Sequence, residues 1–175
     1  VHPYAFTRIL SEEMKSNDIF CGDCGGNIVV TNHAFETKTG QRYFTNNGNS
    51  PMGFSFAGGI GATIASNSDQ NVVCVIGDGG FQLNVQELQT IFVNKLKVKI
   101  FIFQNEGYHA IRVTQDTYFN KRYVGSSNNS GVLLPDIKKI SNSYNIKYSC
   151  ILNNRELDRK LKNILKDDEA EVIEI

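Results

Sequence analysis

A single aspartate stands among glycines in the segment Gly77-Asp78-Gly79-Gly80, directly after an apolar, β-prone run. Glycines at such a position let the backbone approach an anion closely, and a helix that begins there offers main-chain N–H donors. A carboxylate, however, would repel a bound phosphate. A divalent cation between the two removes this conflict, because Mg²⁺ combines one or two protein oxygens with phosphate oxygens and water. The segment therefore predicts a site for Mg²⁺ and a phosphate group.

A second oxygen ligand is predicted at Asn105, which ends the next apolar run and lies 27 positions after Asp78. One strand–helix–strand crossover of this length places the carboxyl ends of two parallel strands side by side. The two side chains can then reach one ion, with the carbonyl of Gly107 as a candidate third ligand. A lone Gly-Asp-Gly is more typical of a surface turn. The matching position of Asn105 favours a metal and diphosphate site instead.

Other polar groups carry less weight. Cys21 and Cys24 form a C-x-x-C pair, but a zinc site normally needs a second pair of ligands at suitable spacing, so ordinary reduced thiols are the favoured interpretation. His109 and Arg112 follow the predicted metal loop. They could face a substrate, or they could lie at the surface or next to the phosphate, and the residue pattern favours neither placement.

The elements that position these residues follow from hydrophobic periodicity. Short apolar or β-prone runs predict strands at residues 18–21, 42–45, 71–76, 98–103, 146–151 and 171–175. Helical spacing predicts helices at residues 3–15, 27–33, 52–66, 85–94, 135–144 and 156–166. Residues 52–66 are rich in small side chains, which favours close packing against a neighbour. Residues 71–76 and 98–103 are apolar throughout, as expected for strands covered on both faces.

The alternation of strand and helix predicts right-handed βαβ units and one α/β domain over residues 1–175. We expect a parallel β-sheet with helices on both faces, a Rossmann-like three-layer sandwich. Ligands of such sheets bind at the carboxyl ends of the strands. A dinucleotide fingerprint at residues 58–61 is a poor match, because no strand precedes those glycines and no third spaced glycine follows.

Composition narrows the partners. Eighteen basic and eighteen acidic residues give a net charge of zero, and no Lys/Arg cluster is long enough to follow a phosphate backbone, so we expect neither nucleic acid nor a membrane as a partner. No apolar stretch approaches the roughly 20 residues of a membrane span, and the first residues lack the regions of a signal peptide. The sequence is expected to be soluble and cytoplasmic.

The chain resembles the thiamine-diphosphate-dependent enzymes. Their signature is matched by Gly77-Asp78-Gly79, an intervening stretch, and Asn105-Glu106-Gly107-Tyr108, while residues 81–91 look like the helix that follows this aspartate in acetolactate synthases. The resemblance covers almost the whole chain. It implies the thiamine-diphosphate-binding fold and the diphosphate-binding (PP) domain of a longer chain, in which Asp78, Asn105 and the Gly107 carbonyl bind Mg²⁺.

The resemblance also implies a set of cofactor-binding residues. These are Gly25, Gly26, Asn27, Ser50, Met52, Asp78, Gly79, Gly80, Asn105, Gly107, Tyr108 and His109. The first three would line the diphosphate. Met52 would be the apolar wedge that bends the cofactor, and the main chain near Ser50 and Met52 would bond to the aminopyrimidine. Tyr108 and His109 would open the helix beside the diphosphate.

Three departures from acetolactate synthases affect the substrate assignment. Those enzymes usually carry a second Asn at the position of Gln104, Ser or a similar residue at that of Gly80, and Gly-Gln-His at residues 25–27. The predicted metal ligands survive these changes. Residues 108–115 resemble synthase-like enzymes of unsettled substrate more than the biosynthetic enzyme.

The resemblance implies a lyase or transferase that decarboxylates a 2-oxo acid and joins the product to an acceptor. The cofactor supplies the carbanion chemistry, and the protein supplies binding, bending and electrostatics. The activating glutamate of the family lies in a pyrimidine-binding domain of the same or a partner subunit, and no glutamate here stands in a matching context. We therefore expect no catalytic residue in this chain, inactivity of the domain alone, and a homo-oligomer, a dimer or larger.

Two other functions stay open. The chain could be the complete small subunit of a split 2-oxo acid decarboxylase, for which its length is suitable. Against this, the first helix resembles the middle of a synthase chain, where this domain begins. The chain could also be a non-catalytic thiamine-diphosphate-binding pseudoenzyme, although the intact Asp78 and Asn105 count against that alternative.

Overall fold

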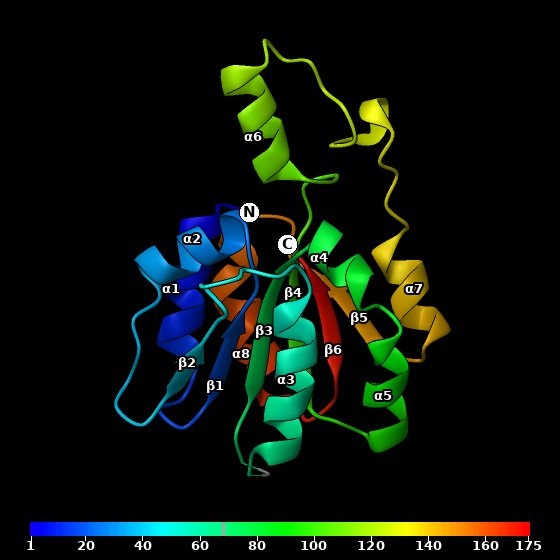
Figure 1. The fold of residues 1–175 in the computed structure, drawn as a ribbon. Coiled ribbons are helices and arrows are strands. Elements are labelled where there is room, and N and C mark those ends of the chain that lie inside the picture. The colour runs from blue at the N-terminus through cyan, green and yellow to red at the C-terminus, as the bar shows by residue number, and fades with distance from the viewer. Residues whose placement is uncertain (68) are drawn as a thin grey trace.

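The chain folds around one parallel sheet. A computed structural model describes residues 1–67 and 69–175, and within them six strands follow the order β2-β1-β3-β4-β6-β5, with every pair parallel (Figure 1). The strands are β1 (Ile19–Gly22), β2 (Arg42–Phe44), β3 (Val72–Gly77), β4 (Val98–Phe103), β5 (Lys147–Cys150) and β6 (Glu171–Glu174). All six predicted strands are present, and the predicted fold class is confirmed.

Helices connect the strands and cover the sheet. They are α1 (Pro3–Glu13), α2 (Gly26–Ala34), α3 (Phe54–Ala65), α4 (Asp78–Leu83), α5 (Glu87–Asn94), α6 (His109–Tyr118), α7 (Ile137–Ser143) and α8 (Leu157–Lys166), with short 3-10 turns η1 (Asn128–Ser130) and η2 (Asn154–Glu156). None of the helices within residues 1–67 and 69–175 combines the length and apolar character of a membrane span.

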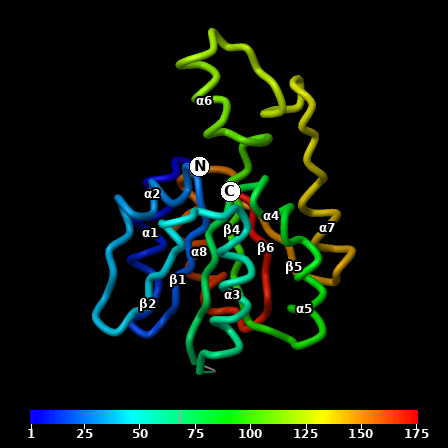
Figure 2. Tube along the Cα trace, viewed as in Figure 1, coloured from blue at the N-terminus to red at the C-terminus, as the bar shows by residue number. Residues whose placement is uncertain are grey.

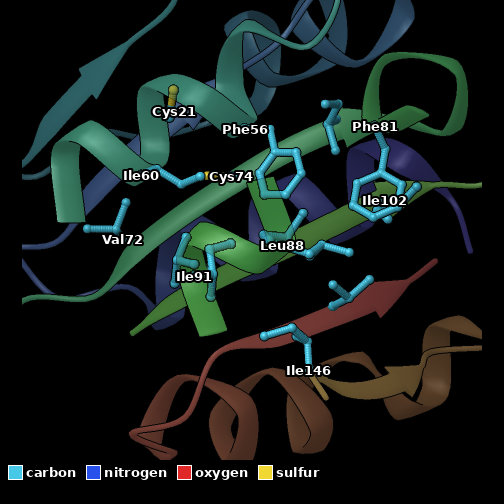
Figure 3. Close-up of a cluster of buried hydrophobic side chains, with 14 of the residues drawn as sticks. Cys21, Phe56, Ile60, Val72, Cys74, Phe81, Leu88, Ile91, Ile102 and Ile146 are labelled. Atoms are coloured by element: carbon cyan, nitrogen blue, oxygen red, sulfur yellow. The ribbon is translucent and has the colours of Figure 1, made fainter. Parts of the chain in front are cut away.

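The sheet buries a separate apolar core on each face, because successive side chains of a strand point to opposite sides. On one face, Cys74 and Ile76 of β3 pack with side chains of α3, α4, α5 and α7 (Figure 3). On the other face, Val73 and Val75 pack with α1 and α8. The central strands are therefore largely apolar, as the sequence predicted. The helices cover the two faces of the sheet and not the ends of its strands.

The helix after β3 begins earlier than predicted. The sequence predicts one helix over residues 85–94, but α4 starts at Asp78 and ends at Leu83, and α5 starts at Glu87. A tertiary contact lies at the break: the Asn84 side chain donates to the carbonyl of Gly53. Asp78 is thus the first residue of a helix.

A row of charged residues favours one strand register near the amino ends of β4, β5 and β6. Glu171 of β6 lies beside Lys99 of β4 and Lys147 of β5 in the strand register. Lys147 Nζ lies 3.5 Å from Glu171 Oε2, and Lys99 Nζ donates to the carbonyl of Glu169 at 2.5 Å. Burial lowers the pKa of Lys99, whereas the carboxylate of Glu171 acts in the opposite direction. A one-residue shift of β6 would separate these charges, so the row favours a single pairing.

One segment extends away from the body of the domain. After β4 the chain leaves the carboxyl ends of the strands, forms α6 and returns only at α7 (Figure 2). Helix α6 has no buried residue, and its exposed side chains include Ile111 and Val113, each 49% exposed. The two chain ends, by contrast, lie close to the carboxyl ends of the strands (Figure 1).

Helix α3 lies so close to β3 that glycine is required at the contact. A Cβ atom at Gly59 would lie 2.0 Å from Cys74 Sγ, whereas a Cβ at Gly61 would meet nothing within 4 Å. We expect Gly59→Ala to lower the free energy of unfolding by about 1–3 kcal/mol through overpacking. Gly61→Ala is the matched control and should raise it by about 0.5–1 kcal/mol, because alanine loses less backbone entropy in a helix. Urea unfolding followed by circular dichroism measures both, and equal effects would contradict the close contact.

Candidate functional site

A cavity of about 570 Å³ opens at the carboxyl ends of β1, β3 and β4. Its lining residues come from the strand-end loops, α2, α6 and both ends of the chain. They are Val1, Pro3, Asp23, Cys24, Gly25, Gly26, Asn27, Val30, Met52, Gly77, Asp78, Gly79, Gly80, Phe103, Gln104, Asn105, Gly107, Tyr108, His109, Ala110, Ile111 and Ile175. This is the edge of a parallel α/β sheet at which ligands bind.

The carboxylate of Asp78 joins two neighbouring strand ends. Gly77 lies opposite Phe103 in the register of β3 and β4, so Asp78 and Asn105 stand just beyond the paired residues. Asp78 Oδ2 accepts hydrogen bonds from the N–H groups of Asn105 at 3.2 Å and Gly107 at 2.9 Å, while its Oδ1 accepts from Gly79 N at 2.8 Å. The side chain is 4% exposed. A carboxylate offers about four acceptor positions, so Oδ1 keeps one for a further ligand.

Two amide oxygens at this edge have no hydrogen-bond donor among the described residues. They are Oδ1 of Asn105 and Oδ1 of Asn27, and both atoms are buried. A buried polar oxygen without a partner is costly. The cost is removed if the oxygen binds a cation or a donor group of a ligand. Together with the Asp78 carboxylate, the Asn105 oxygen provides the oxygen donors that Mg²⁺ prefers, so the residues present fit the predicted metal.

The loop that carries the third candidate ligand is held by Arg112. Gly107 has a φ of +121°, a conformation that disfavours other residues, and its carbonyl accepts a bond from His109 N at 3.2 Å. The Arg112 guanidinium donates to the carbonyls of Asn105 at 2.5 Å and Glu106 at 3.1 Å, and to that of Ser126 at 3.0 Å. The Arg112 side chain therefore supports the backbone of the metal loop. This role differs from both placements that the sequence left open for it.

The structure brings together all of the predicted site residues except one. Gly25, Gly26 and Asn27 begin α2 beside the Asp78 loop, and Tyr108 and His109 stand at the start of α6, all along the cavity. Ser50 is not among the lining residues of the described chain. It is exposed, with its N–H bonded to the carbonyl of Asn46 at 2.7 Å. Met52, two residues later, does line the cavity and is 37% exposed.

Sequence reasoning missed two cavity residues in the loop after β1. Asp23 is 2% exposed and accepts hydrogen bonds from the N–H groups of Gly53 and Ser55. Cys24 lines the cavity beside it, whereas Cys21 is buried within the sheet. Burial raises the pKa of the Cys24 thiol to about 12, and the neighbouring Asp23 carboxylate adds to that increase. An aspartate that directly follows an apolar strand was the available signal, the same one that identified Asp78.

A parallel sheet with glycine-rich strand-end loops, a buried carboxylate and an unpartnered amide oxygen at one edge defines a cofactor-binding α/β domain. Comparison with known families specifies which one. Residues 23–175 match the family model described as thiamine pyrophosphate enzyme, C-terminal TPP binding domain. The chain belongs to this family, whose cofactor is also called thiamine diphosphate.

Several curated relatives are acetolactate synthase large subunits. The chain is 35% identical over 161 residues to a probable acetolactate synthase large subunit of Methanococcus aeolicus, covering 92% of this chain and 26% of that protein. A probable large subunit of Methanocaldococcus jannaschii is 31% identical over 185 residues, covering 100% and 30%. The chain thus spans less than a third of the length of these relatives.

A solved structure supports the fold. Benzoylformate decarboxylase from Polynucleobacter necessarius superposes with a TM-score of 0.84 at 21% identity, covering 100% of this chain and 33% of that one. At this level of identity the likeness concerns the fold alone. It agrees with the parallel sheet and the helices described above.

The raised pKa of Cys24 has a measurable consequence. Only the thiolate reacts with iodoacetamide, so its alkylation rate should rise about tenfold per pH unit from pH 7 to pH 10 without levelling off, whereas an ordinary thiol levels off above a pKa of about 8.5. Mass spectrometry of the Cys24 peptide gives the rate, with free cysteine as the reference thiol. A plateau between pH 8 and pH 9 would show that the thiol is not desolvated.

Proposed function

We propose that the cavity binds thiamine diphosphate together with Mg²⁺, and that Asp78, Asn105 and the Gly107 carbonyl are the protein ligands of the metal. The observation that carries this proposal is the buried Asn105 Oδ1, which has no donor among the described residues, in a residue whose backbone N–H donates to the Asp78 carboxylate. A metal ion would give the Asn105 oxygen and the Asp78 carboxylate a positively charged partner, and it would offset the negative charge of the diphosphate. The family match supports the identity of the organic cofactor.

The remaining lining residues can be assigned to parts of that cofactor. We propose that Gly25, Gly26 and Asn27 line the diphosphate, together with residues 79–80 and the start of α6. The unpartnered Asn27 Oδ1 supports a polar contact on that side of the cavity. Met52 supplies an apolar surface for the heterocyclic end. The exposed Ser50 side chain supports no contact of its own, so any bond from this segment comes from main-chain atoms near Met52.

The reaction that we propose is the decarboxylation of a 2-oxo acid, followed by transfer of the product to an acceptor. The bound cofactor supplies the carbanion chemistry, and this chain binds it, orients it and excludes water. The carboxyl groups along the cavity are those of Asp23 and Asp78, and both accept main-chain N–H bonds. Neither stands ready to activate the cofactor, which supports an activating acid from a pyrimidine-binding domain elsewhere in the protein or in a partner subunit.

Helix α6 supports the presence of such a partner. It stands beside the cavity, has no buried residue and exposes Ile111, Val113 and Tyr118. Apolar side chains gathered on a projecting helix are typical of a surface that another domain covers. The acetolactate synthase relatives are more than three times as long as the part that this chain matches, which leaves room for such domains.

Metal and cofactor binding can be tested together by calorimetric titration of the intact protein. Thiamine diphosphate should bind with Mg²⁺ present and lose its affinity in excess chelator. Asp78→Ala should weaken binding by at least about 100-fold and Asn105→Ala by about tenfold or more, because each removes an oxygen that faces the cation.

Exposed residues of the same types provide the controls. Asp158→Ala on α8 and Asn94→Ala on α5 should leave the affinity unchanged, because both side chains are exposed and distant from the cavity lining. Binding that is equally tight in chelator, or in Asp78→Ala, would refute the proposed metal site.

The separate location of the activating acid predicts that residues 1–175 alone are inactive. With thiamine diphosphate and Mg²⁺ added, the isolated domain should release no CO₂ from pyruvate above the rate of the cofactor in buffer. The physical reason is that the cavity lining contains no glutamate in the described chain. A coupled assay for acetaldehyde or acetolactate measures the outcome, and sustained turnover would contradict the proposal.

A further inference from the structure

The buried carboxylate of Asp23 bonds to the start of α3. Its Oδ2 accepts from Gly53 N at 3.1 Å, and its Oδ1 accepts from Ser55 N at 3.0 Å. These are N–H groups of the first turn, which no residue of the helix itself can bond. Asp23 comes from the loop after β1, so the contact joins two segments that are 30 residues apart in the sequence. The carboxylate therefore fixes the point where the chain passes from Met52 into α3.

The same point is held from a second side by Asn84. Asn84 Nδ2 donates to the carbonyl of Gly53 at 2.9 Å. Gly53 has a φ of +87°, and a Cβ there would lie 2.5 Å from Asn84 Nδ2. Both main-chain polar groups of Gly53 are thus bonded by side chains from the loop after β1 and from the end of α4.

The two side chains are also packed onto the glycine segment of the site. A Cβ at Gly80 would lie 2.6 Å from Asp23 Oδ2, so the carboxylate rests directly on the backbone of α4. Asp23, Gly53, Gly80 and Asn84 form one contact, which we call the Gly53 clasp. Met52 is the residue next to the clasp that reaches the cavity.

Stability alone accounts poorly for a charged group in this position. Burial raises the pKa of the Asp23 carboxyl, although the N–H bonds of Ser55 and Gly53 act in the opposite direction. Burying a carboxylate is costly, and a serine or asparagine would also cap a helix. What the carboxylate adds is two simultaneous N–H bonds in fixed directions, which orient the Met52–Gly53 backbone more tightly than a single cap would.

We propose that Asp23 and Asn84 are positioning residues that hold the Met52–Gly53 backbone in the conformation that recognises the heterocyclic end of the cofactor, and not its diphosphate. This inference rests on the proposed function. Neither side chain reacts with substrate. Their effect passes through Gly53 to Met52, while the metal and diphosphate side of the cavity depends on Asp78, Asn105, residues 25–27, the N–H groups of residues 79–80 and the start of α6.

The test compares two probes on the intact protein with Mg²⁺ present. Thiamine diphosphate has both the diphosphate and the heterocycles, whereas inorganic pyrophosphate has only the former. In calorimetric titrations, Asp23→Asn and Asn84→Ala should weaken thiamine diphosphate binding by about tenfold or more, and should change pyrophosphate binding by less than about twofold, because only the heterocyclic contacts depend on the clasp.

The chain offers a matched control for a buried aspartate. Asp18 is fully buried at the other end of β1, where its oxygens accept from Lys15 N at 2.7 Å and Asn71 N at 2.8 Å. Asp18→Asn should leave the affinities for both probes within about twofold of the original, because its hydrogen bonds lie at the opposite edge of the sheet. Circular dichroism confirms that each variant is folded. If Asp23→Asn does not fold, Asn84→Ala decides the question.

The outcomes separate the two proposals. Selective loss of thiamine diphosphate in the clasp variants supports the inference. Equal loss of both probes, or an unchanged affinity for thiamine diphosphate, overturns it and leaves the proposed function intact. If neither thiamine diphosphate nor pyrophosphate binds to the unmodified protein, the proposed function is overturned, and the positioning role is overturned with it.

Discussion

The hydrogen bonds between the Asp78 carboxylate and the backbone after β4 are the constraint on which the site depends. Two N–H groups of the metal loop point at one buried oxygen, so the end of β3 and the end of β4 cannot move independently. The backbone of Asn105 is thereby held against the carboxylate, and its side-chain oxygen is buried without a donor among the described residues. The Arg112 guanidinium donates to carbonyl groups of the same loop. The protein thus satisfies the backbone of the loop and leaves side-chain oxygens available for a ligand.

The sheet makes this arrangement rigid. Apolar side chains cover both faces of β3 and β4, and Figure 3 shows the cluster on one of these faces. Helices pack on both sides, so the charged residues named here lie at the two ends of the strands. At the carboxyl edge they surround the cavity. At the amino edge, Lys99 donates to a nearby carbonyl, and Lys147 lies close to the carboxylates of Asp167 and Glu171. The first group lines the cavity, and the second lies where the strand register pairs Glu171 with Lys99 and Lys147.

The sequence predicted the fold class, the six strands and the cluster of residues at one edge, because these follow from local patterns. Continuous apolar runs indicated buried strands, and Asp78 and Asn105 stood at their matching ends. Asp23 was not predicted as a site residue, since its partners Gly53 and Ser55 lie about 30 residues away and no periodicity connects them. The early start of α4 and the role of Arg112 were missed for the same reason: each depends on a tertiary contact. Ser50 was named from the resemblance for its main chain. It is not among the described residues that line the cavity, and its hydroxyl donates to the carbonyl of Asn47.

The strand order has a consequence for how the domain is made. Strand β6 follows β5 in the sequence, yet it lies between β4 and β5 in the sheet, and the carbonyl of Ile175 accepts a bond from Gln104 N at 3.1 Å, directly beside the metal loop. During synthesis on the ribosome, the segment after β4 therefore emerges long before its neighbour on that side exists. The binding edge is assembled only when β6 has been made and inserted between β4 and β5, so a chain that stops before β6 has no finished site.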